Sequence, residues 1–187
     1  MKNLIDAKGV DLFWEQPKAL QTRFILVAGE DIYAKLDFNS GFSTSAEAAT
    51  NEDRWTFKRV GLFSTRVIVR QAGSQVDFAT YNPGWTGIQG KIHFATGCQY
   101  DWKVANFWAS RYLLSSDNGL ALITFLSGSR EKNFASIFKQ QAQVVIAPEA
   151  WQLKELPILV LLGWYIVILH IYDSSASATT ASVAVLY

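Results

Sequence analysis

Few side chains in this chain of 187 residues have the chemistry needed for nucleophilic catalysis or metal binding. It contains two histidines, His93 and His170, and a single cysteine, Cys98. A structural zinc site needs four Cys or His ligands, so these three residues cannot complete one, and no metal site is predicted. Cys98 and His93 flank a Thr-Gly turn and could face each other across a hairpin as a thiol–imidazole dyad. The alternative, which we favour, is a turn thiol beside a surface histidine.

Other motifs of catalysis and cofactor binding are missing. Residues 84–90 are glycine-rich, but they lack the G-x-G-x-x-G spacing and the Lys-Ser/Thr ending of phosphate-binding loops. Asp101, Asp117 and Glu131 lie in separate segments, and nothing in the sequence pairs any two of them as acid and base. The sequence therefore predicts a protein without catalytic residues or a cofactor, and we expect that it is not an enzyme.

Four basic side chains form the clearest candidate binding site. If residues 54–60 and 64–71 pair as a hairpin with Val60 opposite Ser64, their outward-facing cations are brought together on one face of the sheet. The hairpin places Lys58 opposite Arg66, and it places Arg54 opposite Arg70. On the other face, the inward positions are apolar: Trp55, Phe57, Val67 and Val69.

Like charges directly opposite each other destabilise a sheet, so a protein that keeps them can use them to hold an anion. A lipid headgroup phosphate is such an anion. The alternative is a solvated outer face on which the long side chains splay apart, or a hairpin whose register is shifted by one residue.

Short segments with turn residues between them must position these side chains. Several segments alternate polar and apolar residues, which is typical of strands with one buried face. About twelve strands at roughly ten-residue spacing predict an antiparallel barrel or sandwich. The expected strands are residues 12–16, 23–28, 31–38, 43–50, 55–60, 65–71, 76–81, 91–95, 99–104, 108–114, 121–126 and 135–147.

Composition and charge exclude several classes of protein. Half of the residues are apolar and 18% are charged, which excludes a disordered chain. The formal net charge is only +1, so we expect no nucleic-acid partner. A single cysteine cannot form an internal disulfide.

The last part of the chain differs from the rest. Residues 148–155 begin with Pro-Glu and predict a short helix. Residues 156–172 are apolar on every side, and a helix of this kind must be enclosed by protein or by lipid. Seventeen residues give roughly 26 Å of helix, slightly short of a ~30 Å hydrocarbon core. A barrel of twelve strands, in turn, has a lumen wider than its own side chains fill. We favour a helix inside the barrel, with a transmembrane helix as the alternative.

The order of these elements resembles the tubby C-terminal-domain and phospholipid-scramblase-like superfamily. The similarity lies in a Trp-Thr-Phe-Lys-Arg strand at residues 55–59, in Leu156-Pro157, and in Leu-Leu-Gly-Trp-Tyr at residues 161–165. The resemblance covers residues 11–172 and implies a twelve-stranded barrel that surrounds a C-terminal hydrophobic helix. The superfamily includes phosphoinositide-binding proteins and proposed lipid translocators. Its barrels bind phosphoinositides through basic side chains, but no specific headgroup ligand maps onto a position here.

We therefore predict one mostly β domain over residues 1–172, with strands in residues 11–147 and a flexible or loosely docked tail at residues 173–187. The central helix contributes its largest apolar side chains to the core: Leu161, Leu162, Trp164, Tyr165 and Ile168. His170, near the end of that helix, is expected to cap carbonyl groups or to reach the barrel mouth.

Three functions are consistent with this fold. The first, which we favour, is a binding module that recognises anionic phospholipid headgroups or a protein partner at a membrane surface. The second is a membrane-anchored accessory subunit that uses residues 156–172 as a transmembrane helix, with Trp102, Trp108 and Trp151 as interface candidates. The third is lipid translocation. Residues 1–16 lack the apolar core of a signal peptide, so we expect a cytoplasmic protein, peripheral on the inner face of a membrane. A single-pass membrane protein is the alternative.

Overall fold

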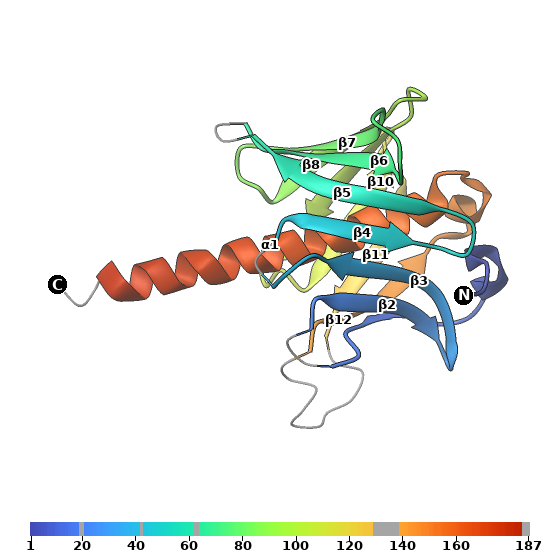
Figure 1. The fold of residues 1–187 in the computed structure, drawn as a ribbon, viewed down its shortest axis with the longest axis horizontal. Helices are drawn as coiled ribbons and strands as arrows, with labels where there is room; N and C mark the ends of the chain where they lie inside the picture. The colour runs from blue at the N-terminus through green and yellow to red at the C-terminus, as the bar shows by residue number, and fades with distance from the viewer. Residues whose placement is uncertain (19–20, 42, 62–63, 129–138, 185–187) are drawn as a thin grey trace.

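Twelve antiparallel strands form a closed barrel in the computed structural model (Figure 1). The structure describes residues 1–187 except 19–20, 42, 62–63, 129–138 and 185–187, and it describes side chains up to Ser175. Each strand pairs with its neighbours in sequence, and β1 pairs with β12 to close the sheet. The strands are β1 (Leu12–Glu15), β2 (Arg23–Ala28), β3 (Asp31–Phe38), β4 (Ser45–Ala49), β5 (Arg54–Val60), β6 (Arg66–Gln71), β7 (Asp77–Pro83), β8 (Gln89–Phe94), β9 (Gln99–Val104), β10 (Arg111–Ser116), β11 (Ala121–Ser127) and β12 (Gln141–Ile146).

The predicted barrel is confirmed, and the alternation of apolar residues explains why it forms. In β5 the side chains of Trp55 and Phe57 are buried, while those of Arg54 and Lys58 are exposed. In β6, Val67 and Val69 are buried in the same way, as the sequence predicted. Tight turns close the hairpins, and Gly97 between β8 and β9 has a φ of 93°, a conformation that side chains disfavour.

A single long helix, α1 (Leu156–Ala184), fills the barrel. Two 3-10 helices occur among the described residues: η1 (Leu4–Ala7) precedes β1, and η3 (Pro148–Gln152) stands where the sequence predicted a short helix. All five side chains predicted to form the helix core are fully buried: Leu161, Leu162, Trp164, Tyr165 and Ile168. The segment Leu156–Ser175 is long and apolar enough to cross a membrane. However, 72% of its most apolar 18-residue stretch is buried inside the protein. The first part of α1, from Leu156 to Leu169, therefore lies in the barrel core.

Aromatic rings join the helix to the wall. Trp164 stacks on Trp14 with ring centroids 5.9 Å apart. Tyr165 stacks on Phe38 and meets Phe57 edge-on, with centroids 5.4 and 5.1 Å away. The Tyr165 hydroxyl donates a hydrogen bond to a backbone carbonyl in the connection between β3 and β4. Burial raises the pKa of Tyr165, which keeps this donor protonated.

Some predicted boundaries are wrong. The backbone stays helical to Ala184, although the sequence predicted that the helix ends at Tyr172. Residues 173–184 contain no Gly or Pro to stop it, and this part of α1 projects out of the barrel (Figure 1). The strand predicted at residues 108–114 begins three residues later, at Arg111. Part of the strand predicted at residues 135–147 lies outside the described residues, and β12 covers Gln141–Ile146.

Candidate functional site

The two ends of the barrel differ in what they carry. Because consecutive strands are antiparallel, the connections that follow odd-numbered strands gather at one end and those that follow even-numbered strands at the other. Helix α1 enters after β12 and η3, at the second end. It leaves at the first, where Asp173 forms an ion pair with Arg59 of β5. We call the end with the connections that follow even-numbered strands the helix-entry end, and the end with the connections that follow odd-numbered strands the helix-exit end. Each comprises its connections, the two strand residues on either side, and the helix residues that reach it.

The helix-exit end is basic. Among its described residues, seven cationic side chains stand against three acidic ones. Two of these acids are in ion pairs, Asp37 with Arg23 at 2.6 Å and Asp173 with Arg59 at 3.0 Å. The cations of this end are Lys18, Arg23, Arg59, Arg66, Lys103, Arg111 and Lys139, and the acids are Glu15, Asp37 and Asp173.

The helix-entry end is acidic. Its described residues include ten carboxylates and five cationic side chains. The carboxylates are Asp6, Asp11, Glu30, Asp31, Glu52, Asp53, Asp77, Asp117, Glu149 and Glu155, and the cations are Lys2, Lys8, Arg54, Arg70 and Lys154. A chain that is almost neutral as a whole therefore has its charge separated along the barrel axis. Such a separation creates a field that orients the molecule toward a charged partner.

The connection between β9 and β10 displays two aromatic rings at the basic end. Phe107 and Trp108 are largely exposed and meet edge-on, with centroids 5.3 Å apart. The side chain of Asn106 holds the loop: its carbonyl accepts from the backbone N–H groups of Ser110 and Arg111, at 3.0 and 2.9 Å. The Asn106 amide also donates to the Ser110 hydroxyl at 2.8 Å. The loop is thus organised by its own hydrogen bonds while its large side chains face outward.

The connection between β7 and β8 displays a third aromatic ring at the same end. Trp85 is fully exposed, and Ile88 in the same loop is half exposed. The backbone N–H of Val104 donates to the carbonyl of Ile88 at 2.7 Å, which ties this loop to the end of β9. Trp85, Phe107 and Trp108, which we call the aromatic tips, therefore stand on two adjacent connections of the same end.

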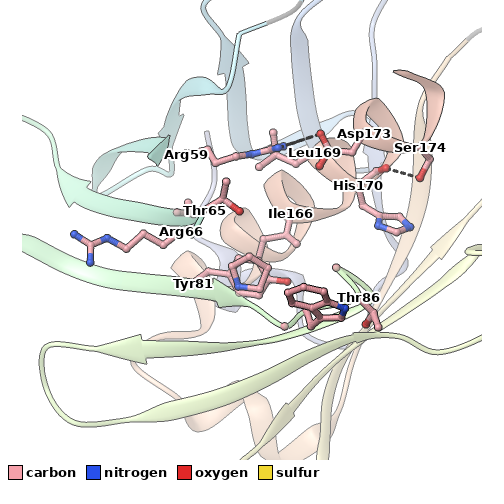
Figure 2. Close-up of a pocket in the computed structure, with 15 residues that line it drawn as sticks. Arg59, Thr65, Arg66, Tyr81, Thr86, Ile166, Leu169, His170, Asp173 and Ser174 are labelled. Atoms are coloured by element: carbon pink, nitrogen blue, oxygen red, sulfur yellow. Dashed lines mark hydrogen bonds and ion pairs between the residues drawn. The ribbon is translucent and has the colours of Figure 1, made fainter. Parts of the chain in front are cut away.

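A cavity of about 390 Å³ opens where α1 leaves the barrel (Figure 2). Its floor is apolar, with Ile166 and Leu169 of the helix, and polar side chains form its rim. His170 lies at the rim and contacts the rings of Trp102 and Tyr112, with centroids 6.3 and 5.9 Å away. His170 thus reaches the barrel mouth, one of its two predicted roles. Burial lowers its pKa, although the nearby Asp173 carboxylate opposes this shift.

The predicted register of the basic hairpin is wrong. Val60 pairs with Arg66 rather than with Ser64, so Lys58 lies opposite Ile68 and not opposite Arg66. The connection between the strands spans five residues instead of three. A shift of two residues keeps every side chain on its predicted face, and the four basic residues all belong to the outer surface.

These four residues are not all gathered into one site, although two of them share a hollow. Arg54 and Arg70 belong to the helix-entry end, and Arg66 to the helix-exit end. The Nε of Arg70 donates to Asp77 at 2.7 Å, so this cation already has an anionic partner. Lys58 and Arg70 line the same hollow on the outside of the barrel, and Glu47 lines it with them.

The residues that suggested chemistry are also separated. His93 pairs with Gln99 across the β8–β9 hairpin, so it does not face Cys98, which is exposed. Adjacent positions on a strand point to opposite faces, and the predicted alternative of a dyad is not formed. Among the described residues, no three His, Cys, Asp or Glu side chains are grouped so that they could hold a metal ion.

Sequence reasoning found part of the aromatic surface. Of the three tryptophans proposed as interface candidates, Trp108 is exposed, Trp151 is half-buried at the other end, and Trp102 is buried in the core. Trp85 and Phe107 were missed, although Trp85 lies in the glycine-rich residues 84–90 and Phe107 lies between two predicted strands. A large aromatic residue inside a glycine-rich loop was the available signal, because such a loop has little with which to cover it.

No protein-family model, curated protein or solved structure matches this chain. The resemblance to the tubby and scramblase-like superfamily therefore stays a prediction.

Proposed function

We propose that this protein is a non-enzymatic binding module that docks its helix-exit end on anionic membrane surfaces. The observation that carries the proposal is the separation of charge along the barrel axis. An anionic bilayer attracts the basic end and repels the acidic end, so attraction and orientation have the same cause. The site differs from the hairpin surface that the sequence suggested, and only Arg66 belongs to both.

The size of the attraction follows from the charge count. Each Lys or Arg near an anionic leaflet contributes about 1 kcal/mol. Seven cations against three acids leave a net four charges at the described helix-exit end, and these correspond to a total on the order of 4 kcal/mol. This raises the affinity for an anionic over a neutral surface about a thousandfold at most. Salt screens exposed charges, so the preference must weaken as ionic strength rises.

Sedimentation with vesicles tests the proposal. The wild-type protein should bind phosphatidylcholine vesicles that contain phosphatidylserine, and it should bind pure phosphatidylcholine vesicles much less. Reversing Arg66, Lys103 and Arg111 to Glu should reduce binding at least about tenfold, since it changes the local charge by six. All three side chains are exposed, so the variant should fold.

The matched control reverses three exposed cations at the helix-entry end: Lys8, Arg54 and Lys154. It makes the same change in net charge, yet it should bind like the wild type. Equal loss in both variants would mean that bulk charge, and not the helix-exit end, governs binding. Equal binding to both kinds of vesicle would overturn the proposal and leave a protein partner as the next candidate.

A further inference from the structure

We propose that the aromatic tips, Trp85, Phe107 and Trp108, insert into the lipid interface when the protein docks. This inference rests on the proposed function, because it takes the helix-exit end as the side that faces the membrane. It adds a second type of contact: the cations attract the protein to the surface, and the rings then anchor it within the bilayer.

The exposure of the tips is unusual for this protein. Their relative exposures are 103% for Trp85, 92% for Phe107 and 82% for Trp108. The other five tryptophans, Trp14, Trp55, Trp102, Trp151 and Trp164, are buried or half-buried. Large exposed apolar side chains that gather in one place mark interaction surfaces, whereas isolated ones need no explanation.

The loop that bears two of the tips is built to hold them outward. Besides the hydrogen bonds of Asn106, the backbone N–H of Ala105 donates to the carbonyl of Arg111 at 2.7 Å. Ala109 has a φ of 48°, the one positive value outside glycine among the described residues. A strained backbone of this kind persists only where its surroundings impose it, and such strain gathers at functional sites. The rings are therefore presented by an ordered turn.

The charges beside the tips identify the occupant as a bilayer. Lys103 precedes the β9–β10 connection and Arg111 follows it, so both cations flank Phe107 and Trp108. A bilayer with anionic lipid offers a negative layer of headgroups and, directly beneath it, an apolar layer. Tryptophan prefers the boundary between the two, because its ring is apolar and its N–H remains hydrated. The cations at the base of the loop and the rings at its tip match this order of layers.

Fluorescence quenching tests the insertion directly. Lipids with brominated acyl chains quench only tryptophans that enter the bilayer, and Trp85 and Trp108 are the exposed ones. We expect phosphatidylserine-containing vesicles with brominated chains to quench the wild-type emission. A Trp85→Phe/Trp108→Phe variant should still bind but lose this quenching, since phenylalanine keeps the apolar ring and removes the fluorophore.

A binding series tests the contribution of the rings. Replacing all three tips by Ser should lower the affinity for anionic vesicles at least about tenfold, since apolar area no longer leaves water. The remaining binding should be released by salt that leaves the wild type bound. Val76→Ser is the control, because Val76 is an exposed apolar residue in the β6–β7 connection at the other end. Unchanged thermal unfolding confirms that each variant is folded.

The two proposals fail in different ways. If the wild type binds anionic vesicles but brominated chains do not quench it, insertion is refuted and electrostatic docking stands. The same conclusion follows if the Ser variant binds as tightly and as salt-resistantly as the wild type. If the wild type does not bind anionic vesicles at all, both proposals are wrong, and the aromatic tips belong to a contact with another protein.

Discussion

Replacing Gly163 by alanine tests the position of the helix inside the barrel. A Cβ atom at this position would lie 2.5 and 2.6 Å from Cζ and Cε2 of Phe125, which projects from β11. Phe125 is fully buried, and its ring packs on Trp164 with centroids 6.4 Å apart. The phenyl ring therefore has little room to retreat, so either it or the helix must move.

Two opposing effects set the size of the change. Alanine favours a helix over glycine by about 1 kcal/mol. Overpacking a core costs typically about 1–3 kcal/mol, and contacts roughly 1 Å shorter than the normal carbon–carbon separation belong to the upper part of that range. We therefore expect Gly163→Ala to lower the free energy of unfolding by about 1–2 kcal/mol. For a chain of this size, Tm should fall by about 2–8 °C.

Thermal and urea unfolding of the full chain measure this change. The double variant Gly163→Ala/Phe125→Leu is the internal check, because the smaller leucine makes room for the new methyl group. It should be more stable than the sum of its two single changes implies. A helix that faced lipid or solvent would instead gain stability from Gly163→Ala. An unchanged or raised Tm would therefore refute the enclosed helix.

Three further predictions concern the core and its ionisable groups. Trp164→Ala should destabilise the protein by about 3–5 kcal/mol, as chemical unfolding would report, because it leaves a cavity on the barrel axis. Burial lowers the pKa of His170, so the imidazole binds a proton more readily in the unfolded chain than in the folded one. The free energy of unfolding should therefore fall as the pH drops below about 6.5. Chemical unfolding above and below this pH should show a smaller loss in His170→Gln than in the wild type. Burial raises the pKa of Tyr112 to about 12, so its phenolate absorbance should appear well above pH 10 in the folded protein. In denaturant the same absorbance should appear at a lower pH, because the side chain is then exposed to water.

The sequence determined the faces of the strands better than their register. Alternation repeats every two residues, so it assigns Trp55 and Phe57 to the core whatever the length of the next turn. For the same reason, the pattern of apolar residues cannot distinguish two strand registers that differ by two residues, because both registers bury the same side chains. The five-residue connection before Arg66 therefore could not be told from a three-residue one, and the predicted opposition of Lys58 and Arg66 was wrong.

The candidate site depends on topology, which explains why sequence reasoning found only part of it. A net charge of +1 conceals the two ends, because cations and carboxylates alternate between successive connections along the chain. Once the strands are known to pair in sequence order, the charges of the connections after odd-numbered and after even-numbered strands can be summed separately. The two sums then show a basic end and an acidic end. The end of α1 was missed for a different reason. Asp173 and the small polar residues after it suggest the end of a helix, but nothing in them prevents a helix from continuing.

The position of α1 also has a consequence for biosynthesis. The buried part of the helix follows all twelve strands in the chain, so it is the last core element to leave the ribosome. Until it arrives, inward side chains such as Trp14 have no axial partner, and β1 must wait for β12 to close the sheet. The barrel therefore cannot complete its folding before residues 156–172 have left the ribosome. Until then the nascent chain exposes unpaired strand edges and aromatic surface, the features that make folding intermediates prone to aggregation.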